Sequence, residues 1–230
     1  MSGKIGSITT DIIKNGLVFN MDAANRASYI PNSSTSYNTA NLSESGSLQN
    51  DTSFITTPTS ASSWHFDGTD DRIIINEINL GKTTFSMNFW IKRSSASHTD
   101  TLLGADMDYG QYVLVLTTSN DVIYTSKNGN YPKYWYDKLI PLNNTGWQNI
   151  VINRYNSTSA DLYVNSINQG SASHTSWALH DTVVDTLGAR GDNSENFEGN
   201  IASVQFYNRA LSSTEILHNY NALKGRFGLT

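Results

Sequence analysis

The last thirty residues of the chain place a strand pattern directly before a helix pattern. Residues 200–208 are rich in β-branched and aromatic side chains, which is typical of a half-buried strand. Ser212, with Glu215 three residues later, has the spacing of a capping box and predicts the start of a helix. That helix should end near Lys224, with Gly225 as the left-handed residue after it.

The apolar face of this helix is predicted to consist of Ile216, Leu217, Tyr220 and Leu223. A lone short helix must dock this face on another element, so the rest of the chain should form that platform.

Most of the remaining chain reads as short strands separated by turns. The clearest strand is residues 83–93, where apolar side chains at every second position from Phe85 to Ile91 alternate with a face that carries Trp90. Further strand patterns cover residues 16–22, 64–66, 72–76, 101–105, 111–117, 121–126, 147–155, 160–165 and 182–188. Strands do not alternate with helices, so a parallel α/β sheet is excluded. The pattern predicts an all-β, two-sheet antiparallel jelly-roll β-sandwich with one C-terminal helix.

Residues 23–62 differ from the strand-rich part because Ser, Thr and Asn dominate them. We expect a long surface excursion here, with short strands near residues 41–48 and 53–56. No change in composition marks a linker elsewhere. One domain is therefore predicted over residues 16–230, preceded by an N-terminal extension of residues 1–15.

Composition excludes several classes of function. The net charge is −5 and no cluster of Lys and Arg occurs, so the chain lacks the basic surface of a nucleic-acid-binding protein. It has no cysteine, which excludes disulfides, thiol catalysis and cysteine-based zinc sites. No apolar run reaches the roughly 20 residues of a membrane span, and no signal-peptide pattern opens the sequence. We therefore expect that the protein does not associate with a membrane. We also expect that it assembles in a cytoplasm.

Several blocks in order resemble laminin-G-like domains of the concanavalin A-like lectin/glucanase superfamily, which includes the pentraxins. The blocks are Phe-Asp-Gly-Thr-Asp-Asp-Arg-Ile at 66–73, the strand at 84–92, Gly-Trp-Gln-Asn-Ile-Val at 146–151, Asp-Leu-Tyr-Val-Asn at 161–165, residues 187–190 and 197–201, and residues 204–212 with 215–216. Ser166 stands where the family usually has glycine. The resemblance implies a two-sheet jelly roll in which the N- and C-terminal strands are neighbours.

The two ends of the chain have a narrower likeness. Residues 16–25 with Ser28 and Tyr29, and residues 219–228, are similar to the ends of such domains in bacteriophage structural proteins. This implies a non-enzymatic accessory virion protein, in a head decoration, tail or fibre, that assembles in the host cytoplasm. Its partners would be other virion proteins and host-surface glycans, and self-association would fit a symmetric particle. The alternatives are a free or cell-surface carbohydrate-binding lectin and a degenerate glycoside hydrolase.

The catalytic pattern of the superfamily's glycan hydrolases is incomplete in this chain. Those enzymes use Glu-x-Asp-x-x-Glu, whose carboxylates act as nucleophile and general acid. The nearest string has Asn193 at the nucleophile position, followed by Glu195 and Glu198 in a polar segment without strand alternation. We interpret these as loop carboxylates and expect no enzymatic activity.

Two kinds of residue suggest ligand sites. Exposed aromatic rings can stack on sugars, and the candidates are Tyr131, Tyr134, Trp135 and Tyr136, together with Trp177. The same aromatic rings could instead form core or subunit contacts.

Many relatives bind calcium with loop carboxylates, and the candidates here are Asp67, Asp70 and Asp71 in one turn, Asp106 and Asp108 in another, and Asp192 with Asn193 in a third. Asp and Asn are also ordinary turn formers, so these clusters have a purely structural interpretation too. No other cofactor is expected.

Overall fold

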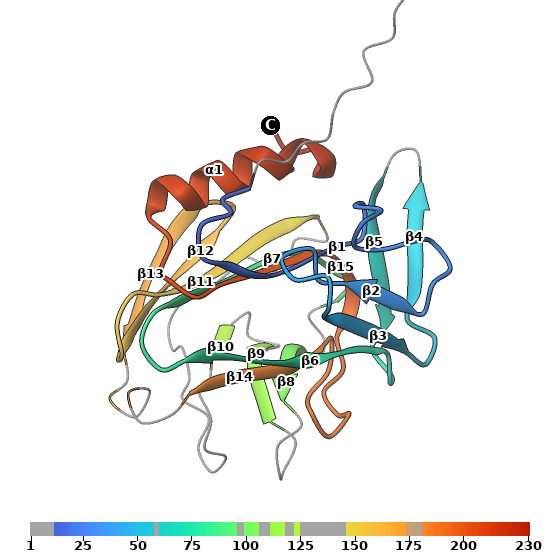
Figure 1. Cartoon of the computed structure of the whole chain (residues 1–230), viewed down its shortest axis with the longest axis horizontal. Coiled ribbons are helices and arrows are strands. Elements are labelled where there is room, and N and C mark those ends of the chain that lie inside the picture. Colours follow the sequence, from blue (N-terminus) through green and yellow to red (C-terminus); the bar gives the residue numbers. More distant parts are fainter. Residues whose placement is uncertain are drawn as a thin grey trace, which may run out of the picture.

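The computed structural model describes residues 12–57, 60–95, 99–105, 111–117, 122–124, 146–173, 175, 178 and 181–230. Over these residues the chain forms two antiparallel sheets that face each other (Figure 1). One α-helix, α1 (Ser213–Leu223), covers the outer side of the larger sheet and is followed by the 3-10 helix η2 (Lys224–Phe227). The predicted all-β jelly-roll sandwich with a C-terminal helix is confirmed.

The order of strands in the larger sheet is β13-β12-β11-β7-β15-β5-β4, and β1 also pairs with β15. Its strands are β1 (Leu17–Asp22), β4 (Ser53–Thr57), β5 (Ser60–Asp67), β7 (Phe85–Arg93), β11 (Gln148–Arg154), β12 (Ser159–Val164), β13 (Ile167–Ser173) and β15 (Glu198–Tyr207). The smaller sheet has the order β10-β9-β8-β14-β6-β3-β2. Its strands are β2 (Thr35–Tyr37), β3 (Ser45–Gln49), β6 (Arg72–Gly81), β8 (Asp100–Ala105), β9 (Gln111–Leu116), β10 (Val122–Tyr124) and β14 (Thr182–Leu187).

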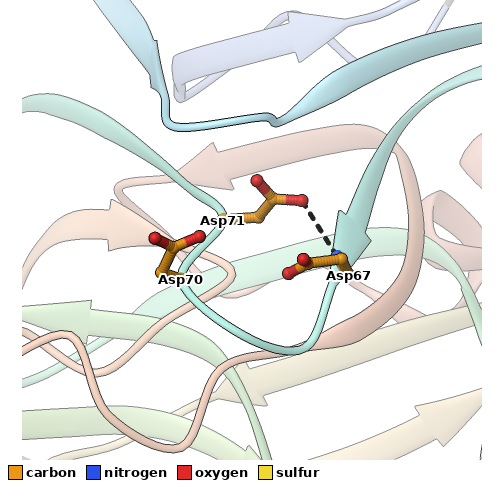
Figure 2. Close-up of side chains that lie close together, drawn as sticks. All are labelled: Asp67, Asp70 and Asp71. Atoms are coloured by element: carbon orange, nitrogen blue, oxygen red, sulfur yellow. Dashed lines mark hydrogen bonds between the residues drawn. The ribbon is translucent and has the colours of Figure 1, made fainter.

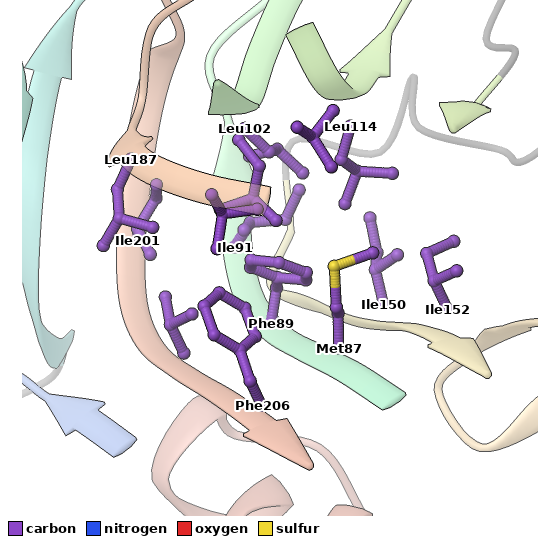
Figure 3. Packing of buried hydrophobic residues seen from close by; sticks show 14 of the residues in the cluster. Met87, Phe89, Ile91, Leu102, Leu114, Ile150, Ile152, Leu187, Ile201 and Phe206 are labelled. Carbon is purple, nitrogen blue, oxygen red and sulfur yellow. The ribbon is translucent and has the colours of Figure 1, made fainter. Parts of the chain in front are cut away.

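The hydrophobic core fills the space between the two sheets. Strand β7 contributes the face that the sequence predicted, which consists of Phe85, Met87, Phe89 and Ile91. Figure 3 shows three of these side chains packed with Ile150, Ile152, Ile201 and Phe206 of the same sheet and with Leu102, Leu114 and Leu187 of the other. The period-2 alternation of β7 therefore identifies the inner face of the sandwich.

Strand β15 brings distant parts of the chain together. It pairs with β7 on one side and with β1 and β5 on the other, and Leu17 of β1 lies opposite Tyr207. The predicted pairing of the first and last strands is confirmed.

Two of the described strands, β2 and β13, were not predicted from the sequence. Their sequences, TSY and INQGSAS, contain mostly small or polar side chains without apolar alternation. Their backbones are ordered by pairing to β3 and β12, which supplies hydrogen bonds that no side-chain pattern reveals. The excursion over residues 23–62 consequently holds more strand than we expected.

Helix α1 begins and ends close to the predicted positions, but the segment that follows it differs from the prediction. Ser212 accepts a hydrogen bond from the Glu215 amide, and Glu215 reaches back to the Ser212 amide, which confirms the capping box. Bidentate hydrogen bonds from Arg209 lower the pKa of Glu215 to about 2. The α-helix ends at Leu223, as expected near Lys224, but the prediction that Gly225 is the left-handed residue after it is wrong. The chain continues through η2, and Gly228 takes the left-handed conformation with φ 70°.

The buried face of α1 is partly the predicted one. Ile216 and Leu223 are buried, whereas Leu217 is 47% exposed and does not belong to this face. A helix turns about 100° per residue, so the position after Ile216 points away from the sheet. Asn219 takes its place, accepting from the Ile13 amide and donating to the Tyr207 hydroxyl.

Trp90 connects the helix to the sheet. Its ring stacks on Phe227 with centroids 4.0 Å apart and on Tyr220 at 5.6 Å. Trp90 is thus fully buried on the outer face of β7, beneath the C-terminal segment. The helix completes a second, smaller core and does not merely decorate the surface.

A chain that ends after Leu211 should fail to fold cooperatively. It would lack α1 and η2, leaving Trp90 and the outer face of β15 in water. Thermal unfolding followed by near-UV circular dichroism is expected to show no cooperative transition. A truncated chain with the full melting temperature would contradict this prediction.

Two leucines of α1 provide a matched control for that experiment. Leu223→Ala should lower the free energy of unfolding by about 2–5 kcal/mol, because it opens a cavity beneath the helix. Leu217→Ala, on the exposed face of the same helix, should change it by no more than about 0.5 kcal/mol. Urea denaturation of both variants measures the difference.

Candidate functional site

The turn between β5 and β6 is built from the block Asp-Gly-Thr-Asp-Asp at residues 67–71. The Thr69 amide donates to Asp67 Oδ1 at 2.7 Å, and the Asp67 amide donates to Asp71 Oδ2 at 2.9 Å. Gly68 has a φ of 80°, and a Cβ at this position would meet the Cβ of Glu198 at 3.0 Å. The turn therefore needs glycine both for its conformation and for its close approach to β15.

Three carboxylates converge on this turn. One oxygen from each of Asp67, Asp70 and Asp71 lies within 4.8 Å of the others (Figure 2). Asp67 and Asp70 are exposed, whereas Asp71 is buried. Burial raises the pKa of Asp71, and repulsion from Asp67 and Asp70 raises it further, against the opposing influence of the Asp67 amide and of His65.

A second loop, at residues 188–197, lies against the turn. The Asn196 side-chain amide donates to the Thr69 carbonyl, which ties the two segments together. The Thr101 amide donates to the Glu195 carbonyl at 2.9 Å, and the Phe197 amide to the Gly188 carbonyl at 2.8 Å. These backbone bonds fix the path of the loop on β8 and at the end of β14.

Between the two segments lies an open pocket of about 770 Å³. The residues that line it are Asp67, Gly68, Thr69, Thr99, Asn193, Ser194, Glu195, Asn196 and Glu198. Every lining side chain is polar, and those that carry charge are acidic. This chemistry suits a hydroxyl-rich ligand or a hard cation, and it disfavours an anion.

The register of β5 and β15 explains why the pocket is acidic. Asp67 and Glu198 are directly opposite each other where the two strands pair. Like charges at such positions destabilise a sheet. The fold therefore keeps two carboxylates together at this rim despite an electrostatic cost.

Asp100 supports the pocket from below. Its side chain is fully buried, pairs with the buried Arg93 guanidinium, and accepts a hydrogen bond from the Glu198 amide at 2.9 Å. One carboxylate thus joins β7, β8 and β15 directly under the acidic rim.

The structure brings together some of the residues that the sequence singled out. Asp67, Asp70 and Asp71 form one cluster. Asp192 lies apart from it, 3.6 Å from the Arg190 guanidinium and hydrogen-bonded to Ser194. The remaining candidates, Asp106, Asp108, Tyr131, Tyr134, Trp135, Tyr136 and Trp177, lie outside the described residues.

Glu195 and Glu198 occupy different kinds of backbone. Glu195 has a left-handed φ of 51° in the loop and lies 3.8 Å from Arg190, whereas Glu198 is the first residue of β15. In the catalytic string of the glycan hydrolases the carboxylates alternate along one strand. Glu195 and Glu198 do not have that arrangement.

Three pocket residues were not recognised from the sequence: Thr99, Ser194 and Asn196. Each is an ordinary loop residue, and only the fold places it opposite the acidic turn. The signal that points to Asn196 and Ser194 is their position inside the 193–198 string, beside Asn193, Glu195 and Glu198.

Comparison with known families gives a match over residues 67–217, to the family described as the concanavalin A-like lectin/glucanases superfamily. The matched segment includes the acidic turn, the second loop and most of both sheets. Comparison with curated protein sequences gives no match.

Solved structures with the same fold include two binding domains and one sialidase. The botulinum neurotoxin serotype D binding domain has a TM-score of 0.68 at 19% identity, over 91% of this chain and 52% of that one. The binding domain of Paraclostridial Mosquitocidal Protein 1 has a TM-score of 0.63 at 16% identity, again over 91% and 52%. Trypanosoma rangeli sialidase has a TM-score of 0.61 at 14% identity, over 92% of this chain and 33% of the enzyme. The chain therefore spans about half or less of these proteins, and the likeness concerns the fold.

The described helices are too short or too polar to cross a bilayer.

Replacing Asp100 tests the support of the rim. Asp100→Asn should lower the free energy of unfolding by about 3–5 kcal/mol, because it removes the carboxylate that pairs with the buried Arg93. Asp51→Asn removes the same charge at an exposed turn and should change stability by no more than about 0.5 kcal/mol. Chemical denaturation measures both, and equal stabilities would show that Asp100 has no supporting role.

Proposed function

Because the chain belongs to the concanavalin A-like lectin/glucanases superfamily, we propose that it is a non-enzymatic, lectin-like domain that binds glycans at the rim pocket. The observation that carries this proposal is the pocket lining, which combines carboxylates, amides and hydroxyls on two neighbouring loops. A family with both lectins and glucanases offers two uses for such a rim, and the residues present support the first.

The polar groups of the pocket suit sugar hydroxyls. Carboxylates of Glu195 and Glu198 can only accept hydrogen bonds, whereas the Asn193 amide and the Ser194 hydroxyl can both accept and donate. A sugar hydroxyl also does both, so a row of such groups can fix the orientation of a glycan. Asn193 lines the pocket, and its Oδ1 has no hydrogen-bond partner among the described residues.

Aromatic contacts are the second part of the proposal. Apolar faces of sugar rings stack on aromatic side chains, and the described wall of the pocket has none. We assign this role to Tyr131, Tyr134, Trp135, Tyr136 and Trp177 on the strength of their sequence pattern alone.

The solved structures give the proposal a wider setting. Two of them are named as binding domains, of a neurotoxin and of a mosquitocidal protein, and one sialidase structure is named as a complex with sialic acid. These names describe those proteins. They support glycan or receptor recognition as a use to which this fold is put.

Binding without hydrolysis is supported by the positions of the two glutamates. Glu195 is in a left-handed loop position 3.8 Å from Arg190, whereas Glu198 is the first residue of β15. The catalytic pattern of the glycan hydrolases places its carboxylates on one strand instead. Asn193 at the nucleophile position of the string adds to this argument.

For the biological setting, we propose an accessory structural protein of a bacteriophage virion, on the head, tail or fibre. This proposed setting rests on the likeness of residues 16–25 and 219–228 to the ends of phage domains. The structure adds that these two ends are neighbours, because Arg226 pairs with Asp22 at 2.7 Å. Other virion proteins and further copies of this chain would be its partners, and host-surface glycans its ligands.

A free or cell-surface lectin is the second candidate. The two binding domains among the solved structures support it, because they share the fold over 91% of this chain. The two candidates use the same pocket and differ in whether the protein is found on particles.

Glycan binding can be tested on an array with the purified chain. Glu195→Gln should weaken binding by about 10-fold or more, because a hydrogen bond to a charged group is worth about 1.5–3 kcal/mol. Trp135→Ala should abolish stacking and reduce binding of the same glycans. Leu217→Ser, on the exposed face of α1, is the control and should bind as the unchanged chain does. Full binding by both site variants would contradict the proposed site, and release of sugar that is lost in Glu195→Gln would contradict a non-enzymatic role.

The virion setting has a separate test. Antibody raised against the purified chain should label the head or tail of phage particles in electron micrographs, at repeated positions set by the particle symmetry. Antibody adsorbed with the purified chain serves as the control and should not label. Particles that lack the protein by mass spectrometry would refute the virion role and leave the lectin role standing.

A further inference from the structure

We infer that residues 12–15 form a strap that opens and closes on the outer face of the larger sheet while both sheets stay folded. Figure 1 shows this segment in dark blue, next to α1 and directly before β1. None of its residues lines the rim pocket, so the strap is a device separate from the proposed glycan binding.

Side chains, and not a neighbouring strand, hold the backbone of the strap, which belongs to none of the described strands. The Ile13 amide donates to Asn219 Oδ1 at 2.8 Å, and the Tyr207 hydroxyl donates to the Ile13 carbonyl at 3.0 Å. The Asn219 side-chain nitrogen donates to the Tyr207 hydroxyl at 3.0 Å, which closes a ring of three hydrogen bonds. The strap can therefore leave this ring without breaking any hydrogen bond between strands.

The strap lies across two apolar clusters on the outer face of the larger sheet. Ile12 packs against the cluster around Trp90, and Ile13 packs against the cluster around Ile216. Both strap isoleucines are only partly buried, and the two residues that follow them are exposed. Opening the strap thus exposes much less apolar surface than unfolding the sandwich does.

A turn at Gly16 joins the strap to β1. The Leu17 amide donates to the Lys14 carbonyl at 3.1 Å, and Gly16 has a φ of 79°. A Cβ at Gly16 would lie 3.0 Å from Arg209 Cγ and 3.0 Å from Asn208 Oδ1, so the turn needs glycine. Pairing between β1 and β15 begins at Leu17, directly after this turn. The strap can therefore move at the turn while β1 stays in the sheet.

The helix does not depend on the strap for its own contact with the sheet. The hydrogen bond between Asn219 of α1 and Tyr207 of β15 does not involve the strap, and both side chains are buried. Ile216 and Leu223 also stay packed beneath the helix. Segments with few buried apolar contacts open at a free energy well below that of global unfolding. We therefore expect an open state in which α1 and both sheets are in place.

Amide hydrogen exchange of the full chain, followed by NMR, tests this inference. The Ile13 amide should be protected, because it is hydrogen-bonded to Asn219 in the closed state. It should still exchange at least about 100-fold faster than the Phe89 amide of β7, which lies in the centre of the larger sheet. Low urea concentrations should accelerate exchange at Phe89 and leave Ile13 nearly unchanged, because a local opening exposes little surface.

Two tyrosines of the same apolar cluster provide matched variants. Tyr207→Phe removes the hydroxyl that bonds the strap and keeps the Asn219 acceptor, so it should raise the Ile13 exchange rate about 10-fold. Tyr163→Phe removes a hydroxyl that is hydrogen-bonded elsewhere and should leave this rate unchanged. If Tyr207→Phe does not fold, Ile12→Ala removes a partly buried contact of the strap and should also accelerate exchange at Ile13.

Three results would overturn the inference. The first is an Ile13 amide with the same exchange rate and urea dependence as Phe89, because the strap would then open only when the domain unfolds. The second is an Ile13 amide without protection, which would mean that the strap is not closed. The third is an equal effect of Tyr207→Phe and Tyr163→Phe, which would show that the whole cluster, and not the bond to the strap, sets the rate.

Discussion

The central position of β15 is the constraint on which the rest of the structure depends. This strand pairs with β7, β5 and β1, so it joins the last segment of the chain to the first and to the middle. Its inward side chains, among them Ile201 and Phe206, fill the core between the sheets. Its outward residue Ala202 lies beneath the C-terminal segment with Trp90. Both cores therefore form only when the last strand is in place.

The same strand creates the rim where we place function. Its first residue, Glu198, is in register with Asp67 at the end of β5, which sets an acidic turn beside an acidic loop. Asp100 anchors that point by accepting from the Glu198 amide and pairing with Arg93. Repulsion between the like charges at the rim lowers the stability of the fold, and the buried ion pair of Asp100 and Arg93 beneath the rim raises it. Such a division is typical of a binding site on a rigid scaffold.

The elements that could be predicted are those whose own residues carry the pattern. The inner face of β7, the capping box of α1 and the fold class follow from local periodicity and short motifs, and all three are confirmed. Strand β13 could not be found, because Ile167–Ser173 is ordered by hydrogen bonds to β12 and its side chains have no alternation. Gly228, and not Gly225, takes the left-handed conformation, because the chain continues from α1 into η2, which packs Phe227 on Trp90.

The residues of the candidate site also fall into two groups, those that the sequence indicates and those that only the fold brings together. The sequence by itself determined the acidic turn, since Asp67, Asp70 and Asp71 lie within five residues and their convergence needs only a tight turn around Gly68. Only the tertiary structure decided that Asn196 and Glu198 face that turn, more than a hundred residues later in the chain. The reason is physical: local patterns fix which residues form a strand or turn, whereas the neighbours of a strand are chosen by burial and register across the whole sandwich.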